Sequence, residues 1–570
     1  MKANTINLRK WQSEAVEKAV KWLVNDRDDH RFLINAAPGA GKTICASVIA
    51  AKLIDLGEVD RVIVIAPMAE VVKSWSEEFE LVTGRIMVKK TNIDEEFEKD
   101  GEDICATWAA TQKLLDGYQK VCRESRVLLI CDEHHHAAVS AAWGEGASSA
   151  FADAKFSLIL TGTPIRSDGE EPVWFAYTEE GKIEHPEDGT YTLTYGAAVE
   201  EGYCNPITFH RYEGNFTVEH EDGEKIKNVT GSSEIIVPKK LKSIKGISRA
   251  LEFYTLARTP IFRSDGITPD SKNSFQAQMF KFADSKLDDA RNLLPNAGGL
   301  VIAPSILMAV YMADLIKEIT GEKPIVVHSA QQETLDKISV FRRSKKRWIV
   351  SVAMISEGVD IKRLRVLFYL PNAQTELFFR QAMGRVVRTI GDKDESYAHV
   401  IMPNYNLFES YALRVENEMS PDALKKMKEP LKEKKCPECQ DFSPIGSQFC
   451  IHPDCGYEFP VKSTHYKECD ECKALNPIYI DTCQECGNKF KSEFIVTLNN
   501  AVRVGAIVRG MDIDENDVRL AEKYKDKWKS QVLATGNSFL INFISTCPPE
   551  GIISLYNIID SDVINEKNLD

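Results

Sequence analysis

The sequence predicts an α/β protein built on parallel sheets, because short apolar runs typical of buried strands alternate with helical patterns. The run RFLIN at residues 31–35 leads through a loop of small residues into the helical pattern ICASVIAAKLI at 44–54. The alternation restarts at residues 298–316, where a strand pattern precedes an amphipathic helical one. With 570 residues, 43% of them hydrophobic, the chain is long enough for several domains that each have a core.

The loop between the first strand and helix has the sequence AAPGAGKT, residues 36–43. Its small residues let backbone N–H groups surround a phosphate, and the next helix adds its positive dipole end. Lys42 is predicted to bridge the β- and γ-phosphates of ATP, and the Thr43 hydroxyl to bind Mg²⁺. Ala36 stands where the commonest form of the motif has its first glycine. The loop residues expected to surround the phosphates are Pro38, Gly39, Ala40 and Gly41.

Two adjacent carboxylates, Asp132 and Glu133, follow the strand pattern LLIC. Asp132 is expected to hold Mg²⁺ through its water shell, and Glu133 to polarise the attacking water. A further strand pattern ends in TGTP at residues 161–164. Arg385 and Arg388 are three residues apart on one helical face, so the pair can reach a γ-phosphate across a cleft. A polar turn after a strand and a solvated helix are the structural alternatives, and neither accounts for the whole series.

Taken in order, these motifs resemble those of superfamily 2 helicases and translocases. The resemblance covers about the first three-quarters of the chain. The motifs that carry it are LRKWQ at 8–12, the phosphate loop, APM at 66–68, DEHH at 132–135, LTGTP at 160–164, SEGVD at 356–360 and QAMGRVVR at 381–388.

This resemblance implies two RecA-like lobes with ATP and Mg²⁺ in the cleft between them. Gln12 takes the position that recognises adenine, and His134 the one that links hydrolysis to nucleic-acid contact. Gly358 and Asp360 are implied to couple the nucleotide to the bound strand. Arg388, helped by Arg385, is implied to complete the catalytic site from the second lobe. A metal site formed by the run of three histidines is disfavoured, because the first histidine already has this role.

Eight cysteines form two sets with the spacing of zinc ligands. Each Cys-x2-Cys turn can present two thiolates to one ion, so each set predicts a closed tetrahedral Zn²⁺ site. His452 and His465 lie close in sequence, but four cysteines per set make them unnecessary, and disulfides suit an intracellular motor poorly. The first set ends in a Cys-x4-Cys pair and is the less regular. The sets are Cys436, Cys439, Cys450 and Cys455, then Cys469, Cys472, Cys483 and Cys486.

The net charge of −14 is unusual for a protein that binds phosphates, but it speaks to solubility rather than to the sign of one cleft. The basic runs at 342–347 and 425–435 are better explained as a solvated face and a linker. No apolar run is long enough to span a membrane and no signal-peptide pattern is present, which predicts a cytoplasmic protein. Five aromatic residues lie among the two cysteine sets and are interleaved with lysines. They suit either base stacking or the minimal core of a small zinc-binding domain. They are Phe442, Phe449, Tyr457, Phe459 and Tyr466.

These observations predict two RecA-like lobes with parallel sheets, two zinc ribbons and a small α+β C-terminal domain. The helicase core followed by ribbons is similar to RadD-type DNA repair proteins and to restriction-type motors. One hypothesis is an autonomous ATP-driven DNA helicase or translocase of repair or genome maintenance. The other is a motor or DNA sensor in a defence or restriction complex, whose ribbons and tail bind proteins. The predicted boundaries are 1–209 for the first lobe, 210–296 for a linker or inserted subdomain, 297–424 for the second lobe, 425–490 for the ribbons and 491–570 for the accessory domain.

Overall fold

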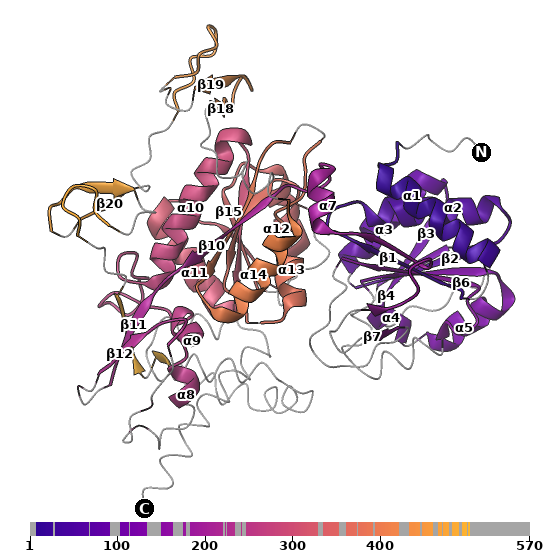
Figure 1. Ribbon diagram of the computed structural model, residues 1–570, viewed down its shortest axis with the longest axis horizontal. Coiled ribbons are helices and arrows are strands. Elements are labelled where there is room, and N and C mark those ends of the chain that lie inside the picture. Colours follow the sequence, from indigo (N-terminus) through magenta and orange to yellow (C-terminus); the bar gives the residue numbers. More distant parts are fainter. Residues whose placement is uncertain are drawn as a thin grey trace, which may run out of the picture.

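The structure is a computed structural model of the whole chain (Figure 1). Within the part that it describes, no helix is long and apolar enough to cross a membrane. The residues described are 7–26, 29–67, 69–91, 103–112, 114–133, 150–162, 175–177, 183–220, 223, 225–233, 237, 241, 247–328, 334–352, 361–372, 374–391, 394–420, 433–444, 447, 449–459, 466–469, 471–477, 482–488, 493–498 and 500–501.

The first lobe is a parallel sheet with strand order β3-β4-β2-β5-β6-β1-β9 among the described residues. Its central strands are mostly apolar because helices cover both faces of such a sheet. The six residues of β2 and of β5 are all buried. The strands are β1 (Arg31–Ala36), β2 (Arg61–Ala66), β3 (Met87–Lys90), β4 (Asp103–Thr107), β5 (Val127–Asp132), β6 (Phe156–Thr161) and β9 (Thr190–Leu193). The helices are α1 (Lys10–Val20), the π-helical η1 (Lys21–Asp26), α2 (Lys42–Asp55), α3 (Ala69–Thr83), α4 (Trp108–Gln112) and α5 (Leu115–Glu124).

The second lobe repeats this architecture with the parallel order β10-β17-β16-β13-β15-β14. The predicted return of the α/β alternation at 298–316 is confirmed by β13 and α11. The edge strand β10 straddles the boundary drawn at residue 209. The strands are β10 (Ile207–Tyr212), β13 (Gly298–Ala303), β14 (Ile325–Val327), β15 (Trp348–Val352), β16 (Leu364–Tyr369) and β17 (Ala398–Pro403). The helices are α10 (Phe275–Leu293), α11 (Ile306–Thr320), α12 (Thr334–Arg343), α13 (Glu376–Met383) and α14 (Asn406–Glu418).

Figure 1 shows the first lobe in indigo beside the second in pink and orange, with α7 (Tyr195–Glu200) between them. Short elements outside the two main sheets lie within the first lobe's segment, after β10, and at the end of the described chain. A mixed sheet has the order β12-β11-β22, in which β22 pairs parallel with β11 although it comes after the cysteine-rich region. These elements are β7 (Ala176–Tyr177), β8 (Ile183–Glu184), β11 (Asn215–Glu219), β12 (Lys225–Val229), α8 (Ile247–Ala250), α9 (Phe253–Ala257) and β22 (Glu493–Thr497).

The cysteine-rich region contains two small antiparallel hairpins, as ribbons of this size require. In Figure 1 the first hairpin lies above the second lobe, and the second lies beside this lobe, on the side away from the first lobe. In the first ribbon, β18 packs against α10 of the second lobe. The hairpin strands are β18 (Glu433–Lys435), β19 (Phe442–Pro444), β20 (Tyr466–Glu468) and β21 (Leu475–Pro477). Two parallel-sheet lobes followed by cysteine-rich hairpins agree with the predicted fold class.

Candidate nucleotide-binding site and metal centres

The predicted phosphate loop joins the end of β1 to the start of α2. Gly39 and Gly41 have φ angles of 82° and 93°, a left-handed conformation that a residue with a Cβ adopts only under strain. Ala36 is still part of the buried strand β1, and its φ is not positive, so alanine is tolerated where the commoner motif has glycine. The loop therefore has glycine at the two positions where its backbone demands it.

Lys42 is the first residue of α2, and its Nζ lies inside the loop, 3.0 Å from the carbonyl oxygen of Ala36. It is also 3.9 Å from Oε1 of Glu133. Gly162, just after β6, gives the lysine room, because a Cβ at this position would lie 2.9 Å from its Nζ. The lysine side chain thus reaches from one strand end to the next across the loop.

Asp132 ends β5 and Glu133 follows it, so both carboxylates lie at the carboxyl edge of the sheet, where ligands of such sheets bind. Burial, with the neighbouring Glu133 charge as a second cause, raises the pKa of Asp132 to about 6. Glu133 adopts a left-handed φ of 51°, and its Oε2 accepts a 3.4 Å hydrogen bond from the backbone N–H of Gly162. Two adjacent carboxylates beside Lys42 form a site suited to a divalent cation.

Residues of the second lobe complete a cavity over this edge. The backbones of the lobes meet closely: a Cβ on Gly384 would lie 2.4 Å from Cβ of Pro38, and one on Gly39 would lie 3.0 Å from Cγ of Arg388. The cavity therefore brings together the five residues predicted for catalysis, from both lobes. It is lined by Pro38, Gly39, Gly41, Lys42, Thr43, Pro67, Val71, Ser74, Trp75, Glu78, Asp132, Glu133, Gly162, Gln381, Arg385 and Arg388.

Asn205, in the segment just before β10, holds the backbone of the motif QAMGRVVR that carries Arg385 and Arg388. Asn205 is 1% exposed; its N–H donates to the carbonyl oxygen of Val387 at 2.6 Å and its Nδ2 to that of Arg388 at 3.1 Å. Asn205 Nδ2 also donates to Asp394, whose carboxylate pairs with the fully buried Arg365. Arg388 is therefore anchored through its main chain, while its side chain lies over the phosphate loop.

Gln12 occupies a position behind the loop and does not line the cavity. Its Oε1 accepts from the backbone N–H of Arg9 at 2.8 Å, and its Nε2 donates to the carbonyl oxygen of Gly41 at 2.9 Å. Arg9 and Trp11 each donate to the carbonyl oxygen of Ala40, at 2.9 and 3.1 Å. The loop is thus supported by residues of the LRKWQ motif that the sequence prediction had not assigned a role.

Some predicted residues lie outside the described part of the chain. His134, Gly358 and Asp360 are among them, as is His465. Conversely, Trp75, Glu78 and Gln381 line the cavity and were not predicted. Gln381 opens the quoted motif QAMGRVVR, so its signal was present. The two residues of α3 carried no motif signal of their own.

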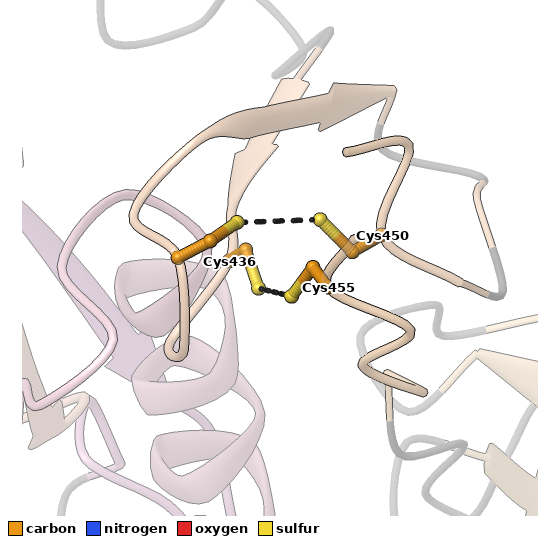
Figure 2. A group of neighbouring side chains, drawn as sticks. Cys436, Cys450 and Cys455 are labelled. Atoms are coloured by element: carbon orange, nitrogen blue, oxygen red, sulfur yellow. Dashed lines mark hydrogen bonds between the residues drawn. The ribbon is translucent and has the colours of Figure 1, made fainter. Parts of the chain in front are cut away.

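Each predicted cysteine set comes together in space. In both sets the four sulfur atoms lie within 4.8 Å of one another. The Cys436–Cys455 and Cys439–Cys450 sulfur distances are 3.6 and 3.5 Å, and Figure 2 shows the side chains of the first set turned toward a common centre. A tetrahedral Zn²⁺ with sulfur ligands at about 2.3 Å places its sulfurs about 3.8 Å apart, so the donor set fits zinc.

The second set has the same geometry, with sulfur distances of 3.6 Å for Cys469–Cys486 and 3.5 Å for Cys472–Cys483. The backbone N–H of Cys486 is the main cause that lowers the pKa of Cys483 to about 6, which favours the thiolate form that binds metal. His452 is not part of the first set; its Nε2 lies 3.5 Å from Asp441. The cysteines alone therefore suffice as ligands.

Of the aromatic residues in the first ribbon, none of the four whose burial is described is fully buried. Phe442 and Phe449 are 47% and 52% exposed, whereas Tyr457 and Phe459 pack edge to face with centroids 5.3 Å apart. Lys434 Nζ lies 4.0 Å from the centroid of Phe459. The sequence allowed these aromatic residues to serve either base stacking or a minimal core. Phe442 and Phe449 are too exposed to belong to a core.

Comparisons with known proteins agree with this geometry. The family of the type III restriction enzyme res subunit matches residues 5–166, and the helicase conserved C-terminal domain matches residues 285–390. Fold and matches together define the class of these two regions: they form a superfamily 2 helicase-type core, whose first part is of the res-subunit type.

Similar proteins of unassigned function occur in mycobacteria. An uncharacterized protein of Mycobacterium leprae (strain TN) is 31% identical over 385 residues, which cover 67% of this chain and 60% of the relative. One from Mycobacterium tuberculosis (strain ATCC 25618 / H37Rv) is 31% identical over 382 residues, covering 67% and 59%. The chain thus matches about three fifths of the length of these curated relatives.

Among solved structures, the fold is similar to the ATP-dependent Type ISP restriction-modification enzyme LlaBIII bound to DNA. The sequence identity is 13% and the TM-score 0.46, with 94% of this chain and 36% of the other covered. This likeness is too loose to bear on function.

Proposed function

We propose that the protein is an ATP-driven DNA translocase or helicase that acts in DNA repair or genome maintenance. The observation that carries the proposal is the cavity between the lobes, which brings Lys42, Asp132 and Glu133 of one lobe together with Arg385 and Arg388 of the other. A site divided between two lobes changes shape whenever its nucleotide changes, and this coupling is what a motor needs. The Res-type match supports DNA as the track.

In this mechanism the loop N–H groups and Lys42 would bind the phosphates, and Thr43 and Asp132 would hold Mg²⁺. The metal neutralises charge on the phosphate oxygens when it is bound. Glu133 orients the attacking water and takes up its proton. Arg388, with Arg385 beside it, stabilises the charge that develops on the γ-phosphate, and only when the lobes are closed. Hydrolysis then removes the γ-phosphate that Arg388 contacts from the second lobe, so the two lobes can separate.

Two features of the structure support a role for Glu133 as the base rather than as a second metal ligand. Its left-handed backbone turns it away from the line of β5, and its Oε2 is oriented by the N–H of Gly162. Asp132, by contrast, continues the strand and is buried. The adjacent carboxylates therefore have different environments, as a division of labour requires.

The test is ATP hydrolysis by the purified chain at low salt, with no polymer, single-stranded DNA, duplex DNA, branched DNA or RNA. We expect one of the DNAs to stimulate hydrolysis, and that polymer identifies the track. Stimulation by RNA alone would contradict the DNA assignment. No stimulation by any polymer, with ATP still bound, would favour the second candidate below.

The second candidate is a motor or sensor subunit of a defence or restriction assembly, whose ribbons dock onto protein. Charge favours it: residues 433–459 contain five carboxylates and two lysines, and residues 466–488 again five and two. A Zn²⁺ bound by four thiolates adds two further negative charges to each ribbon. An excess of carboxylates around the hairpins works against contact with the DNA backbone, so the exposed Phe442 and Phe449 suit a protein partner better than stacked bases.

This candidate is tested by co-purification of the untagged chain with a stoichiometric second protein. The matched variant is Phe442→Ser with Phe449→Ser, which leaves the cysteines and both lobes untouched. Loss of the partner in the variant, with zinc content and basal ATP hydrolysis kept, is the expected result. Loss of single-stranded DNA affinity instead would assign the aromatics to nucleic acid.

A further inference from the structure

Helix α3 presents one face to the cavity, through residues spaced as i, i+3, i+4 and i+7. These are Val71, Ser74, Trp75 and Glu78. Trp75 is 1% exposed, so its ring is fixed by packing while its edge reaches the site. Its Nε1 donates a 2.7 Å hydrogen bond to Oδ2 of Asp132, 57 residues away in the sequence. The helix is thus joined to the strand end that carries the candidate Mg²⁺ ligand.

The hydrogen bond from Trp75 can orient the carboxylate of Asp132 without neutralising its charge. An indole N–H is a donor only, so Trp75 can stabilise the charged carboxylate and cannot accept a proton in exchange. It is a neutral donor, so the negative charge of Asp132 is kept for a cation. Within the described residues Asp132 forms no ion pair, although it is buried. A bond to one carboxylate oxygen also fixes the plane in which the other can approach a metal-bound water.

The second lobe offers a comparison. Trp348 is also buried, and its Nε1 donates to Oδ1 of Asp284 at 2.8 Å. That carboxylate, however, is paired with Arg347 at 2.6 Å and lies outside the cavity. The same donor thus serves a carboxylate paired with an arginine in one lobe and, beside the phosphate loop of the other, a carboxylate that has no ion pair among the described residues.

We propose that Trp75 is a positioning residue, which orients Asp132 for Mg²⁺ through its indole N–H. The inference rests on the proposed ATPase function and adds to it a residue outside the predicted motifs. Partners that orient metal ligands typically contribute about 10- to 100-fold to metal affinity. We therefore expect loss of the indole N–H to lower the affinity for the metal about 10- to 100-fold. Nucleotide affinity in the absence of metal should not change.

The experiment is a Mn²⁺ titration of the full chain, followed by electron paramagnetic resonance, with a non-hydrolysable ATP analogue bound. Trp75→Phe removes the N–H and keeps a ring, and Trp348→Phe is the matched control. Benzothienylalanine at position 75 replaces only the N–H by sulfur, so it decides the question if Trp75→Phe does not fold. Nucleotide affinity in EDTA is measured in parallel.

We expect both position-75 variants, Trp75→Phe and benzothienylalanine, to bind Mn²⁺ more weakly than wild type. Trp348→Phe should bind Mn²⁺ like wild type. Unchanged Mn²⁺ affinity in a folded position-75 variant would overturn the inference and leave the proposed function standing. A purely structural role would lower the melting temperatures of both Phe variants without moving Mn²⁺ affinity, and would also overturn it. Failure of the wild-type protein to bind Mn²⁺ with nucleotide would overturn the proposed function, and this inference with it.

Discussion

Gly384 is the place where the smallest change should open the cavity. It follows α13 in a right-handed helical conformation, with φ −57° and ψ −14°, so alanine adopts this backbone without strain. The added Cβ, however, would lie 2.4 Å from Cβ and 2.9 Å from Cγ of Pro38 in the other lobe. Because carbon atoms pack at about 3.5–4.0 Å, Gly384→Ala must separate the two segments by roughly 1 Å.

That displacement acts on the arginines, since Arg385 is adjacent and Arg388 follows one turn later. A misplacement of about 1 Å in a catalytic group typically costs about 100-fold in rate. We therefore expect Gly384→Ala to lower kcat/KM for ATP about 100-fold. Each lobe keeps its own buried core, so the melting temperature should change little.

The assay is steady-state ATP hydrolysis with the stimulating polymer, for Gly384→Ala, Pro38→Gly and the double variant. Pro38→Gly removes the atoms that the alanine would strike, so the two changes should couple. The double variant should lose less activity than the two single losses predict together. A wild-type rate for Gly384→Ala, or strictly additive losses, would refute this account of lobe closure.

Three other predictions concern the loop, the ribbons and a histidine pair. Lys42→Ala should abolish nucleotide binding in equilibrium titrations, whereas Glu133→Gln should keep binding and slow hydrolysis about 10²- to 10⁴-fold; normal turnover by Glu133→Gln would remove it as the base. Cys469→Ser should release one of two zinc ions by elemental analysis with the core ATPase intact; full zinc retention would rule out the second site. Burial lowers the pKa of His210 to about 3 and that of His399 well below its usual value, and their rings lie 3.2 Å apart at nitrogen. The unfolded chain therefore takes up protons first, and stability should fall by about 1.4 kcal/mol per histidine for each unit below about pH 6.5. Urea unfolding against pH checks this, and a slope unchanged by His399→Gln would count against it.

The order of motifs along the chain predicted most of the fold and the candidate site, because each is a local signal. A strand pattern, a loop of small residues and a helix pattern lie next to one another in the sequence. The conformation of AAPGAGKT could therefore be predicted from its neighbours alone. The cysteine sets did the same through their spacing.

Contacts between distant segments were not accessible in this way. Trp75 is one apolar residue on an amphipathic helix until the packing of α3 on α2 brings its N–H to Asp132. The pairing of β22 with β11 likewise depends on where the ribbons return the chain. The exposure of Phe442 is a third case, because a domain this small has too little interior to bury all of its apolar side chains.

If both lobes contribute to one catalytic site, Arg388→Ala should disable hydrolysis from the second lobe while the phosphate loop of the first stays intact. The measurement is single-turnover ATP hydrolysis beside equilibrium ATP binding, with the stimulating polymer present. We expect ATP binding to be retained while hydrolysis falls about 10³-fold or more, as for other arginines supplied across a cleft. Hydrolysis at the wild-type rate by Arg388→Ala would contradict it.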